Sequence, residues 1–94
     1  MQLEIITPEQ RIFSGEAEAV QLPGKEGRFQ ILDSHAPLIS TLQAGVVKID
    51  LPGKAAEEEL HTLLKREKSS NSLSMQIKGG VAEVQQGKLI LLAD

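Results

Sequence analysis

Residues able to do acid–base or nucleophilic chemistry are few in this chain of 94 residues. It contains two histidines, His35 and His61, and no cysteine, which excludes thiol catalysis, disulfides and cysteine-ligated metal. Neither histidine lies in the HExxH spacing of a zinc site. The best remaining candidate for chemistry is His35 with its neighbours in the sequence.

Asp33, Ser34 and His35 are the residue types of a hydrolase triad. Three consecutive residues cannot normally aim their side chains at one another in relay geometry, so we interpret them as a polar loop with His35 held by local hydrogen bonds. Residues 24–27 lack the spacing of a phosphate loop, and the acidic run 57–59 fits a solvated helix start better than a cation site. We predict a protein that is not an enzyme and needs no cofactor or metal.

The composition argues against several kinds of partner. The net charge is −3 and the only aromatic residues are two phenylalanines, which disfavours phosphate-backbone binding and base stacking. No N-terminal run resembles a signal peptide, and the longest apolar run, residues 89–93, is too short to span a bilayer. We therefore expect no nucleic acid partner, and membrane association only through another protein.

Strict alternation of apolar and polar residues dominates the chain and predicts strands with one buried and one exposed face. The alternating segments are residues 3–5, 17–22, 29–31, 47–51, 73–77 and 82–84, followed by an apolar strand over 88–93. The phase of the alternation shifts between Ala19 and Val20, which indicates a bulge or a change of face. Several short strands at this spacing favour a single β-sandwich or barrel domain over residues 1–94.

Turn chemistry separates the expected strands. The Pro-Gly pairs at 23–24 and 52–53 predict type II turns, because proline fixes φ and glycine accepts a positive φ. The pair Gln86-Gly87 predicts a tight hairpin between the last two strands.

One segment has a helical period instead. Ala56, Leu60, Leu63 and Leu64 form an apolar stripe, with acidic residues before it and basic residues after it. We predict an amphipathic helix over 54–68, within an insertion that covers about 54–72 and packs on the sheet through its leucines. The short stripe and mixed polar face argue against a lipid-binding helix.

Short motifs follow one another in a specific order. They are ITPE at residues 6–9, IFSGE at 12–16, LPGKEGRF at 22–29, ILDSHAPL at 31–38, LQAGVVKI at 42–49, GGVAEV at 79–84 and LLAD at 91–94. In type and order they resemble the epsilon subunit of F-type ATP synthases, over about residues 2–50 and 73–94.

The resemblance implies a flattened ten-stranded β-sandwich at the foot of the central stalk. In that family one surface of the sandwich packs on the gamma subunit, and loops at one end touch the c-ring. The resemblance thus implies a non-catalytic rotor subunit that secures the joint carrying torque from the ring to the catalytic beta subunits. It also implies a place at the cytoplasmic face of the bacterial plasma membrane, in a peripheral complex.

The resemblance places the ring contact on two segments. The residues are Glu26, Gly27, Arg28, His35, Ala36 and Pro37. Gly27 permits a tight turn, Pro37 stiffens its loop, and Arg28 and His35 can contact carboxylates or carbonyls. The alternative is that these residues only shape turns. Position 28 is commonly acidic in the family, so Arg28 predicts a compensating acidic group on the ring.

The chain also departs from the family pattern. Gln30, Asp33 and Ser34 stand where Gly, Pro and Gly are common, which leaves the loop conformation open. Full-length members continue beyond the Leu-Ala-Asp segment into a two-helix domain that can inhibit ATP hydrolysis and in some members binds ATP. Because the sequence stops at Asp94, we expect neither property; a natural short form, which we favour, and a cut piece both fit. The alternative function is an unrelated adaptor or ligand-binding module, which predicts a concave apolar pocket away from residues 26–37.

Overall fold

The structure is a computed structural model that describes residues 1–53, 60–67 and 71–94. Ten strands and no helix form in those residues. The strands are β1 (Gln2–Ile6), β2 (Arg11–Glu16), β3 (Ala19–Gly24), β4 (Gly27–Leu32), β5 (Leu38–Leu42), β6 (Gly45–Asp50), β7 (Lys65–Arg66), β8 (Ser72–Ile77), β9 (Gly80–Gln85) and β10 (Lys88–Ala93).

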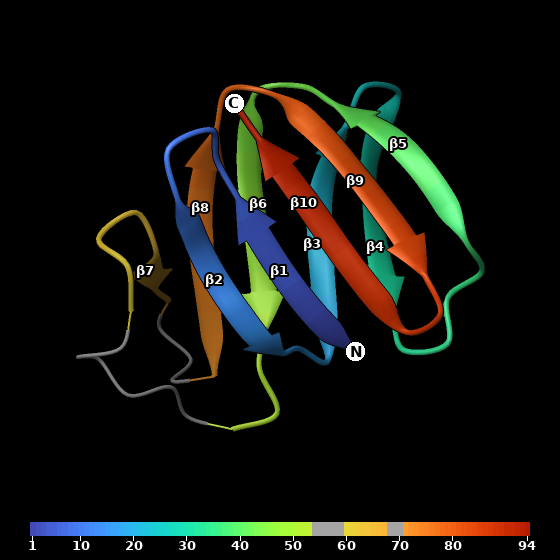
Figure 1. Cartoon of the computed structure of the whole chain (residues 1–94), viewed down its shortest axis with the longest axis horizontal. Coiled ribbons are helices and arrows are strands. Elements are labelled where there is room, and N and C mark those ends of the chain that lie inside the picture. The colour runs from blue at the N-terminus through green and yellow to red at the C-terminus, as the bar shows by residue number, and fades with distance from the viewer. Residues whose placement is uncertain (54–59, 68–70) are drawn as a thin grey trace.

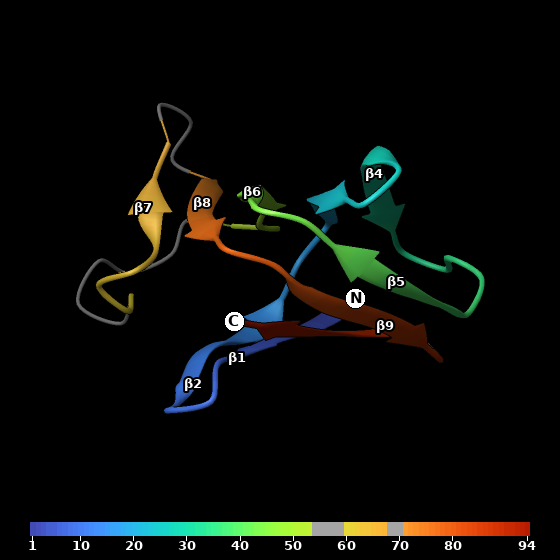
Figure 2. The ribbon, with the colours of Figure 1, turned by 90° about the horizontal axis from the view of Figure 1, so that it is seen from above.

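The strands form one sheet that folds over into two layers. Its order is β2-β1-β10-β9-β5-β3-β6-β8-β7, and β4 pairs with β3 outside this path. The two layers join where β5 meets β3 through the single pair Gly24/Leu42, and they lie over one another in the view from above (Figures 1 and 2). The predicted ten-stranded β-sandwich is confirmed.

The core lies between the layers and consists of aliphatic side chains. The first and last strands are parallel neighbours, and Leu3 of β1 and Leu89 of β10 lie side by side, fully buried. Val47 and Ile49 of β6 are equally buried in the opposite layer. Each such side chain contributes roughly 1.5–3 kcal/mol through burial, so the alternation in the sequence is what holds the layers together.

The phase shift near residue 19 marks the place where the chain changes layer. After β2 the chain crosses over at Ala17 and Glu18, whose backbone N–H groups donate to Met1 O (2.8 Å) and Asp50 O (2.7 Å). Ala19 and Val20 are then both buried at the start of β3. The predicted change of face is confirmed, and its cause is the crossing between layers.

The turn predictions had different outcomes. Gln86 and Gly87 have φ values of 49° and 75°, so the predicted tight hairpin is confirmed, with the positive φ at both positions that a type I′ turn requires. The type II turn at Pro23-Gly24 is wrong, because both residues belong to β3 and the chain reverses at Lys25 and Glu26. Gly53 also lacks a positive φ, so the second type II turn is wrong as well.

Close packing, and not a turn, explains why glycine occupies position 24. A Cβ atom there would lie 2.5 Å from the Gly27 carbonyl oxygen and 2.8 Å from the Phe29 ring. Pro23 pairs with Arg28 of β4, but its backbone faces the other side of β3, where its carbonyl oxygen accepts the Gln43 N–H. Because β6 pairs only with residues 19–21 of β3, no strand on that side needs a proline N–H.

The predicted helix is wrong where the structure describes it. Residues 60–64 form bends and turns, and Lys65–Arg66 form strand β7, which pairs with β8. The remainder of the predicted 54–68 helix, residues 54–59 and 68, lies outside the described residues. The free edge of β8 offers backbone partners that override the helical period. Leu64 is buried and Leu60 packs against the core, but Leu63 is 52% exposed, so the predicted packing of the leucines holds for two of the three.

Candidate functional site

The two predicted ring-contact segments lie at opposite ends of β4. Glu26 is in the β3–β4 turn and Gly27 and Arg28 begin β4, whereas residues 35–37 lie in the connection from β4 to β5. Figure 1 shows the turn and this connection at opposite ends of the strand. At about 3.3 Å per residue, the length of β4 separates the two segments by roughly 17 Å. The fold does not bring these residues into one cluster.

The β3–β4 turn is tight and anchored to the neighbouring layer. Gly24 and Gly27 are the pair that closes it, and Gly27 has a φ of 130°, which agrees with the role predicted for this glycine. The Lys25 N–H donates to the Thr41 carbonyl oxygen of β5 at 3.0 Å. The side chains of Lys25, Glu26 and Arg28 are exposed. The turn therefore presents charged side chains on a fixed backbone.

A groove of about 580 Å³ lies between this hairpin and β5. The hairpin contributes the charged side chains of Lys25, Glu26 and Arg28, Ser40 and Thr41 of β5 add hydroxyl groups, and the apolar side chains are Phe29 and the 74% exposed Ile39. Its lining residues are Gly24, Lys25, Glu26, Gly27, Arg28, Phe29, Ile39, Ser40 and Thr41. Within residues 1–53, 60–67 and 71–94, neither Lys25 nor Arg28 takes part in an ion pair.

Local hydrogen bonds hold His35 at the other end of β4. Its backbone N–H donates to the Leu32 carbonyl oxygen at 3.2 Å, and Nδ1 lies 2.7 Å from the Ala36 carbonyl oxygen and donates to it. Ser34 has a φ of 66°, a left-handed conformation that glycine adopts more easily. The predicted polar loop is confirmed. Ser34, which stands where the family commonly has glycine, holds a strained backbone conformation.

Asp33 faces the chain terminus, away from any relay with His35. Its Oδ1 lies 2.6 Å from the Met1 ammonium, which also contacts Glu16 Oε2 (3.3 Å) and donates to the Ala17 carbonyl oxygen (2.8 Å). The hydrogen bond that this ammonium donates to Asp33 raises the pKa of the ammonium above its ordinary value of 8.0. A hydrolase triad at residues 33–35 is therefore excluded by the direction of Asp33.

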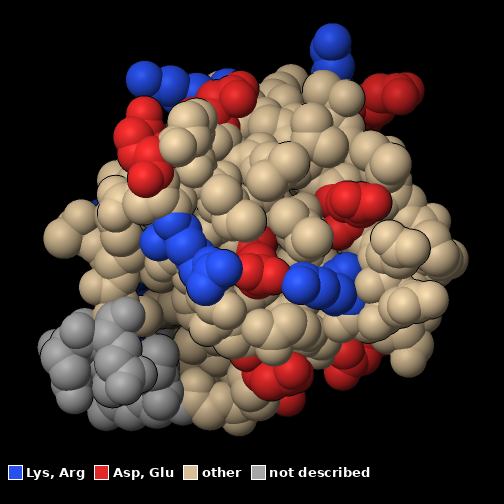
Figure 3. All heavy atoms as spheres, in the orientation of Figure 1, with Lys and Arg blue, Asp and Glu red and all other residues tan. Residues whose placement is uncertain are grey.

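Sequence reasoning missed a second exposed surface, the outer face of β1, β10, β9 and β5. The register aligns Ile6, Leu92 and Val81 in a row across three strands; Leu92 is 50% exposed and Val81 is 38% exposed. Figure 3 views this face and shows a broad area of uncharged atoms beside a small group of charged ones. Only the register between distant strands creates this row, so no local pattern could have predicted it.

Two cationic side chains on this face share one carboxylate. Lys88 Nζ lies 2.7 Å from Glu4 Oε2, and Arg11 Nη2 lies 3.4 Å from Glu4 Oε1. The hydrogen bond from Lys88 holds the pKa of Glu4 below its ordinary value of 4.5. Glu83, two strands away in the same cross-strand row, has no ion pair among the described residues.

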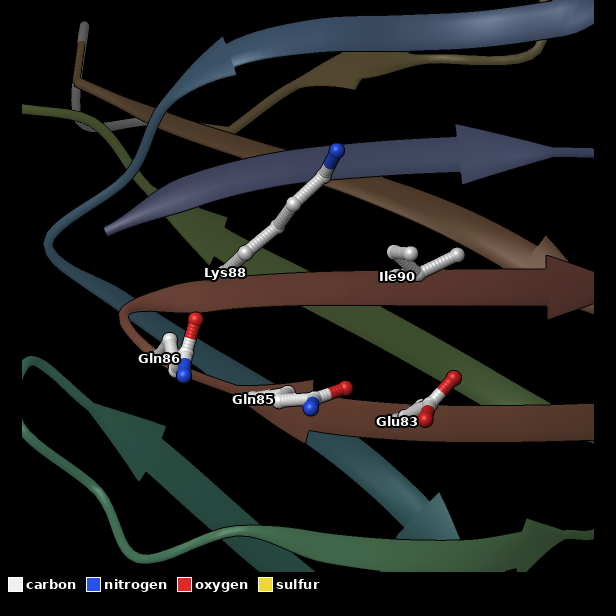
Figure 4. A pocket seen from close by; sticks show the side chains of 5 residues that line it. All are labelled: Glu83, Gln85, Gln86, Lys88 and Ile90. Atoms are coloured by element: carbon white, nitrogen blue, oxygen red, sulfur yellow. The ribbon is translucent and has the colours of Figure 1, made fainter.

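The hollow on the β9–β10 hairpin has no catalytic arrangement. It measures about 340 Å³ and is lined by Glu83, Gln85, Gln86, Lys88 and Ile90. Figure 4 shows Lys88 extending toward β1, where Glu4 lies, while Glu83 stands on the neighbouring strand β9. The polar groups do not converge on one point.

Two further site types are missing from the residues that the structure describes. No group of three or more His, Asp or Glu side chains in them could hold a metal ion. Those residues also form no helix long and apolar enough to cross a bilayer.

Comparisons with known proteins agree on one family. The model of the ATP synthase delta/epsilon chain β-sandwich domain matches residues 1–63. The ATP synthase epsilon chain of Campylobacter curvus is 36% identical over 94 residues, covering all of this chain and 60% of that protein. The epsilon chain of Herminiimonas arsenicoxydans is 37% identical, with 56% of its length covered. The chain thus spans about three fifths of the length of these relatives.

A shorter relative and two solved structures extend the comparison. The ATP synthase epsilon chain of Chlorobium limicola is 38% identical over 92 residues, which cover 98% of this chain and 86% of that protein. In fold, the chain resembles part of the Tetrahymena thermophila mitochondrial ATP synthase central stalk and c-ring, with a TM-score of 0.72 at 13% identity over 98% of this chain and 61% of that one. A chain of the Euglena gracilis mitochondrial ATP synthase gives 0.70 at 18% identity, over 97% and 48%. By sequence and by fold, this chain belongs to the ATP synthase delta/epsilon family of β-sandwich domains.

Proposed function

We propose that this chain is a non-catalytic central-stalk subunit of an F-type ATP synthase, coupling rotation of the c-ring through the gamma subunit to ATP synthesis. The observation that carries the proposal is the match along the whole chain to ATP synthase epsilon chains. The site of action is then the cytoplasmic face of a bacterial plasma membrane, in a peripheral complex. The chain's part in catalysis is mechanical.

The fold suits a mechanical role. Its two layers share one aliphatic core, and the hairpin is tied to β5 by backbone hydrogen bonds between Lys25 and Thr41 and between Gln43 and Pro23. Interiors packed in this way have low compressibility and transmit strain. A body of this kind can hold two partner surfaces at a fixed separation while the assembly turns.

The two predicted ring-contact segments have different access to a ring. Both border β4, so a ring loop lying along β4 would reach Arg28 and the segment 35–37. A ring loop that meets only the hairpin would reach Glu26, Gly27 and Arg28. We propose the hairpin as the ring contact, because its charged side chains are exposed and, for Lys25 and Arg28, without ion pairs among the described residues.

The alternative function, a ligand-binding module, requires a concave apolar pocket away from residues 26–37. The hollow of about 660 Å³ beside β7 is the largest candidate there, and Lys48, Lys65 and Glu67 are among its lining residues. Ligand pockets are mostly apolar with a few convergent polar groups, and this hollow lacks that pattern. No observation favours the alternative.

Co-purification with gamma tests the proposal. The chain and the gamma subunit of the same organism are co-expressed and analysed by size-exclusion chromatography with light scattering. We expect a 1:1 complex that persists at moderate salt. The Val81→Asp variant tests whether the apolar row on the outer face contacts gamma, and Lys48→Asp, at an exposed position of β6, is its matched control. Separate elution of the unmodified proteins at both low and moderate salt would contradict the proposal.

A further inference from the structure

We infer that the hollow beside β7 binds an extended, acidic segment of a partner protein, which adds a strand to the half-covered edge of β8. The hollow of about 660 Å³ is bounded by the loop before β7 and by β6 and β8, in the layer opposite β1, β10 and β9. The inference therefore goes beyond the proposed function and does not depend on the contacts with gamma and the ring.

The backbone of β8 is the first argument. At the start of the ladder between β6 and β8, the Leu51 N–H donates to the Asn71 carbonyl oxygen at 2.7 Å. Hydrogen-bonded and open pairs alternate in an antiparallel ladder, so the backbone groups of Ser72, Ser74 and Gln76 point away from β6. These groups are available to a neighbour on the other side of β8.

Strand β7 occupies only two of these three positions. The Glu67 N–H donates to the Ser72 carbonyl oxygen at 2.9 Å, and Lys65 pairs with Ser74. Figure 2 shows β7 at the edge of the layer, beside β8. Among the described strands nothing pairs with Gln76 on this side, and Gln76 lines the hollow. An extended segment lying in the hollow would continue the ladder at Gln76, as in strand addition to a sheet edge.

An exposed apolar wall is the second argument. Two hydrogen bonds to His61 hold the chain before β7 in a turn: the Leu63 N–H donates to Nδ1 at 3.1 Å and the Leu64 N–H donates to the carbonyl oxygen at 3.0 Å. This turn buries Leu64 and leaves Leu63 52% exposed at the hollow, which Val46 lines from β6. An apolar side chain of the partner segment that covers Leu63 would remove apolar surface of both chains from water.

Unpaired charge is the third argument and gives the sign of the partner. Lys48 and Lys65 are exposed, line the hollow and form no ion pair within residues 1–53, 60–67 and 71–94. The acidic lining residue Glu67 accepts a hydrogen bond from the Ser74 hydroxyl at 2.9 Å. A surface with excess positive charge is complementary to a negatively charged partner. The added segment should therefore carry carboxylates toward the two lysines.

Peptide binding to the full chain tests the inference. The probe is a fluorescent peptide of alternating Glu and Val, and its Kd is measured by fluorescence polarisation. We expect a Kd about tenfold lower than that of the same peptide with Lys in place of Glu, because the lysines of the hollow repel cations. Methylation of alternate backbone nitrogens in the acidic peptide keeps its charges and removes its strand hydrogen bonds, and should raise the Kd about tenfold.

Two leucines of equal exposure supply matched variants. Leu63→Ser should raise the Kd of the acidic peptide about fivefold, whereas Leu32→Ser, at a position that is 53% exposed on β4, should leave it unchanged. The double variant Lys48→Glu and Lys65→Glu should lose the preference for the acidic peptide. Circular dichroism of each variant checks that the fold is kept.

Several outcomes would overturn the inference. They are no measurable binding of the acidic peptide, equal binding of the basic or the methylated peptide, and equal effects of the two leucine variants. A dimer of this chain that Leu63→Ser dissociates, detected by light scattering, would also overturn it, because a second copy would then be the occupant. None of these measurements includes gamma or the ring, so such results would leave the proposed function standing, and a chain that binds the peptide but not gamma would leave only the inference standing.

Discussion

The hairpin groove and the outer face of β1, β10 and β9 differ in whether their cationic side chains form ion pairs. On the outer face, Glu4 is paired with both Lys88 and Arg11, and the apolar row of Ile6, Leu92 and Val81 lies beside this cluster. In the groove, Lys25 and Arg28 stand exposed and without an ion pair in the described residues. The comparison teaches that charges already paired within the chain serve the fold, whereas unpaired charges beside apolar surface are available to a partner.

The largest effect we expect concerns the shape of the groove. Gly24→Ala would push a Cβ atom within 2.5 Å of the Gly27 carbonyl oxygen, so the hairpin has to move. We expect a loss of roughly 2–3 kcal/mol in the free energy of unfolding, measured by urea denaturation. Gly27→Ala is the matched comparison: it meets no atom within 4 Å but has a φ of 130°, and should cost about 1 kcal/mol through backbone strain. Equal losses in both variants would mean that close packing does not shape the groove.

The paired and unpaired charges should differ in their effect on stability. Glu4→Gln leaves Lys88 and Arg11 without their carboxylate, so we expect a lower thermal midpoint at pH 7. Arg28→Gln should leave the midpoint unchanged, because the side chain is exposed and unpaired. Thermal unfolding followed by circular dichroism measures both variants. A larger decrease in the thermal midpoint for Arg28→Gln than for Glu4→Gln would contradict this expectation.

The comparison of Glu4→Gln with the unmodified chain also predicts a pH dependence. The pKa of Glu4 is lowered in the folded protein, so its contribution to stability is present above the ordinary value of 4.5 and is lost as the pH falls through the folded value. The difference in midpoint between Glu4→Gln and the unmodified chain should therefore shrink on acidification below pH 4.5. A difference that stays constant to pH 2 would show that the carboxylate charge is not its cause.

A smaller effect is expected at the terminal ammonium. Its pKa is raised above 8.0, so its contribution is fully present below pH 8.0 and is lost as the pH rises through the folded value. The partners Asp33 and Glu16 are largely exposed, which limits the size of this contribution. Asp33→Asn should flatten the alkaline part of the stability curve between pH 8 and 10, measured by urea denaturation. An unchanged curve would argue against the contact with Met1.

The smallest effect is expected at Ser34. Ser34→Gly relieves a φ of 66° in the loop before His35 and should raise the free energy of unfolding by about 0.5 kcal/mol, since part of the gain is offset by a more flexible unfolded chain. Binding to the ring should stay the same, because this loop lies outside the proposed contact. Weaker ring binding in this variant would bring the 35–37 segment back into the contact.

Local patterns in the sequence predicted what local physics decides. The alternation at residues 73–77 appears in β8 with Leu73, Met75 and Ile77 buried, and Gln86-Gly87 forms the expected hairpin. Strand β7 was missed because its backbone partners belong to β8, and a helical period in isolation cannot report the presence of a sheet edge.

The candidate site depends on the same kind of information. The resemblance named two segments as the ring contact, and the positive φ of Gly27 agrees with the turn predicted there, whereas the contact itself stays a prediction. The contact between Met1 and Asp33, the row of Ile6, Leu92 and Val81, and the separation of Arg28 from His35 all depend on which strands become neighbours. Residues distant in sequence meet only after the layers have formed, so no window of the sequence contains this information.

Cross-linking in the assembled complex tests the central claim most directly. A cysteine at position 28 and a cysteine at position 81 are compared in separate complexes that also carry a single cysteine in the polar loop of the ring. The account predicts that Arg28→Cys forms a disulfide with the ring loop under mild oxidation and that Val81→Cys does not. Efficient cross-linking from position 81 and none from position 28 would contradict it.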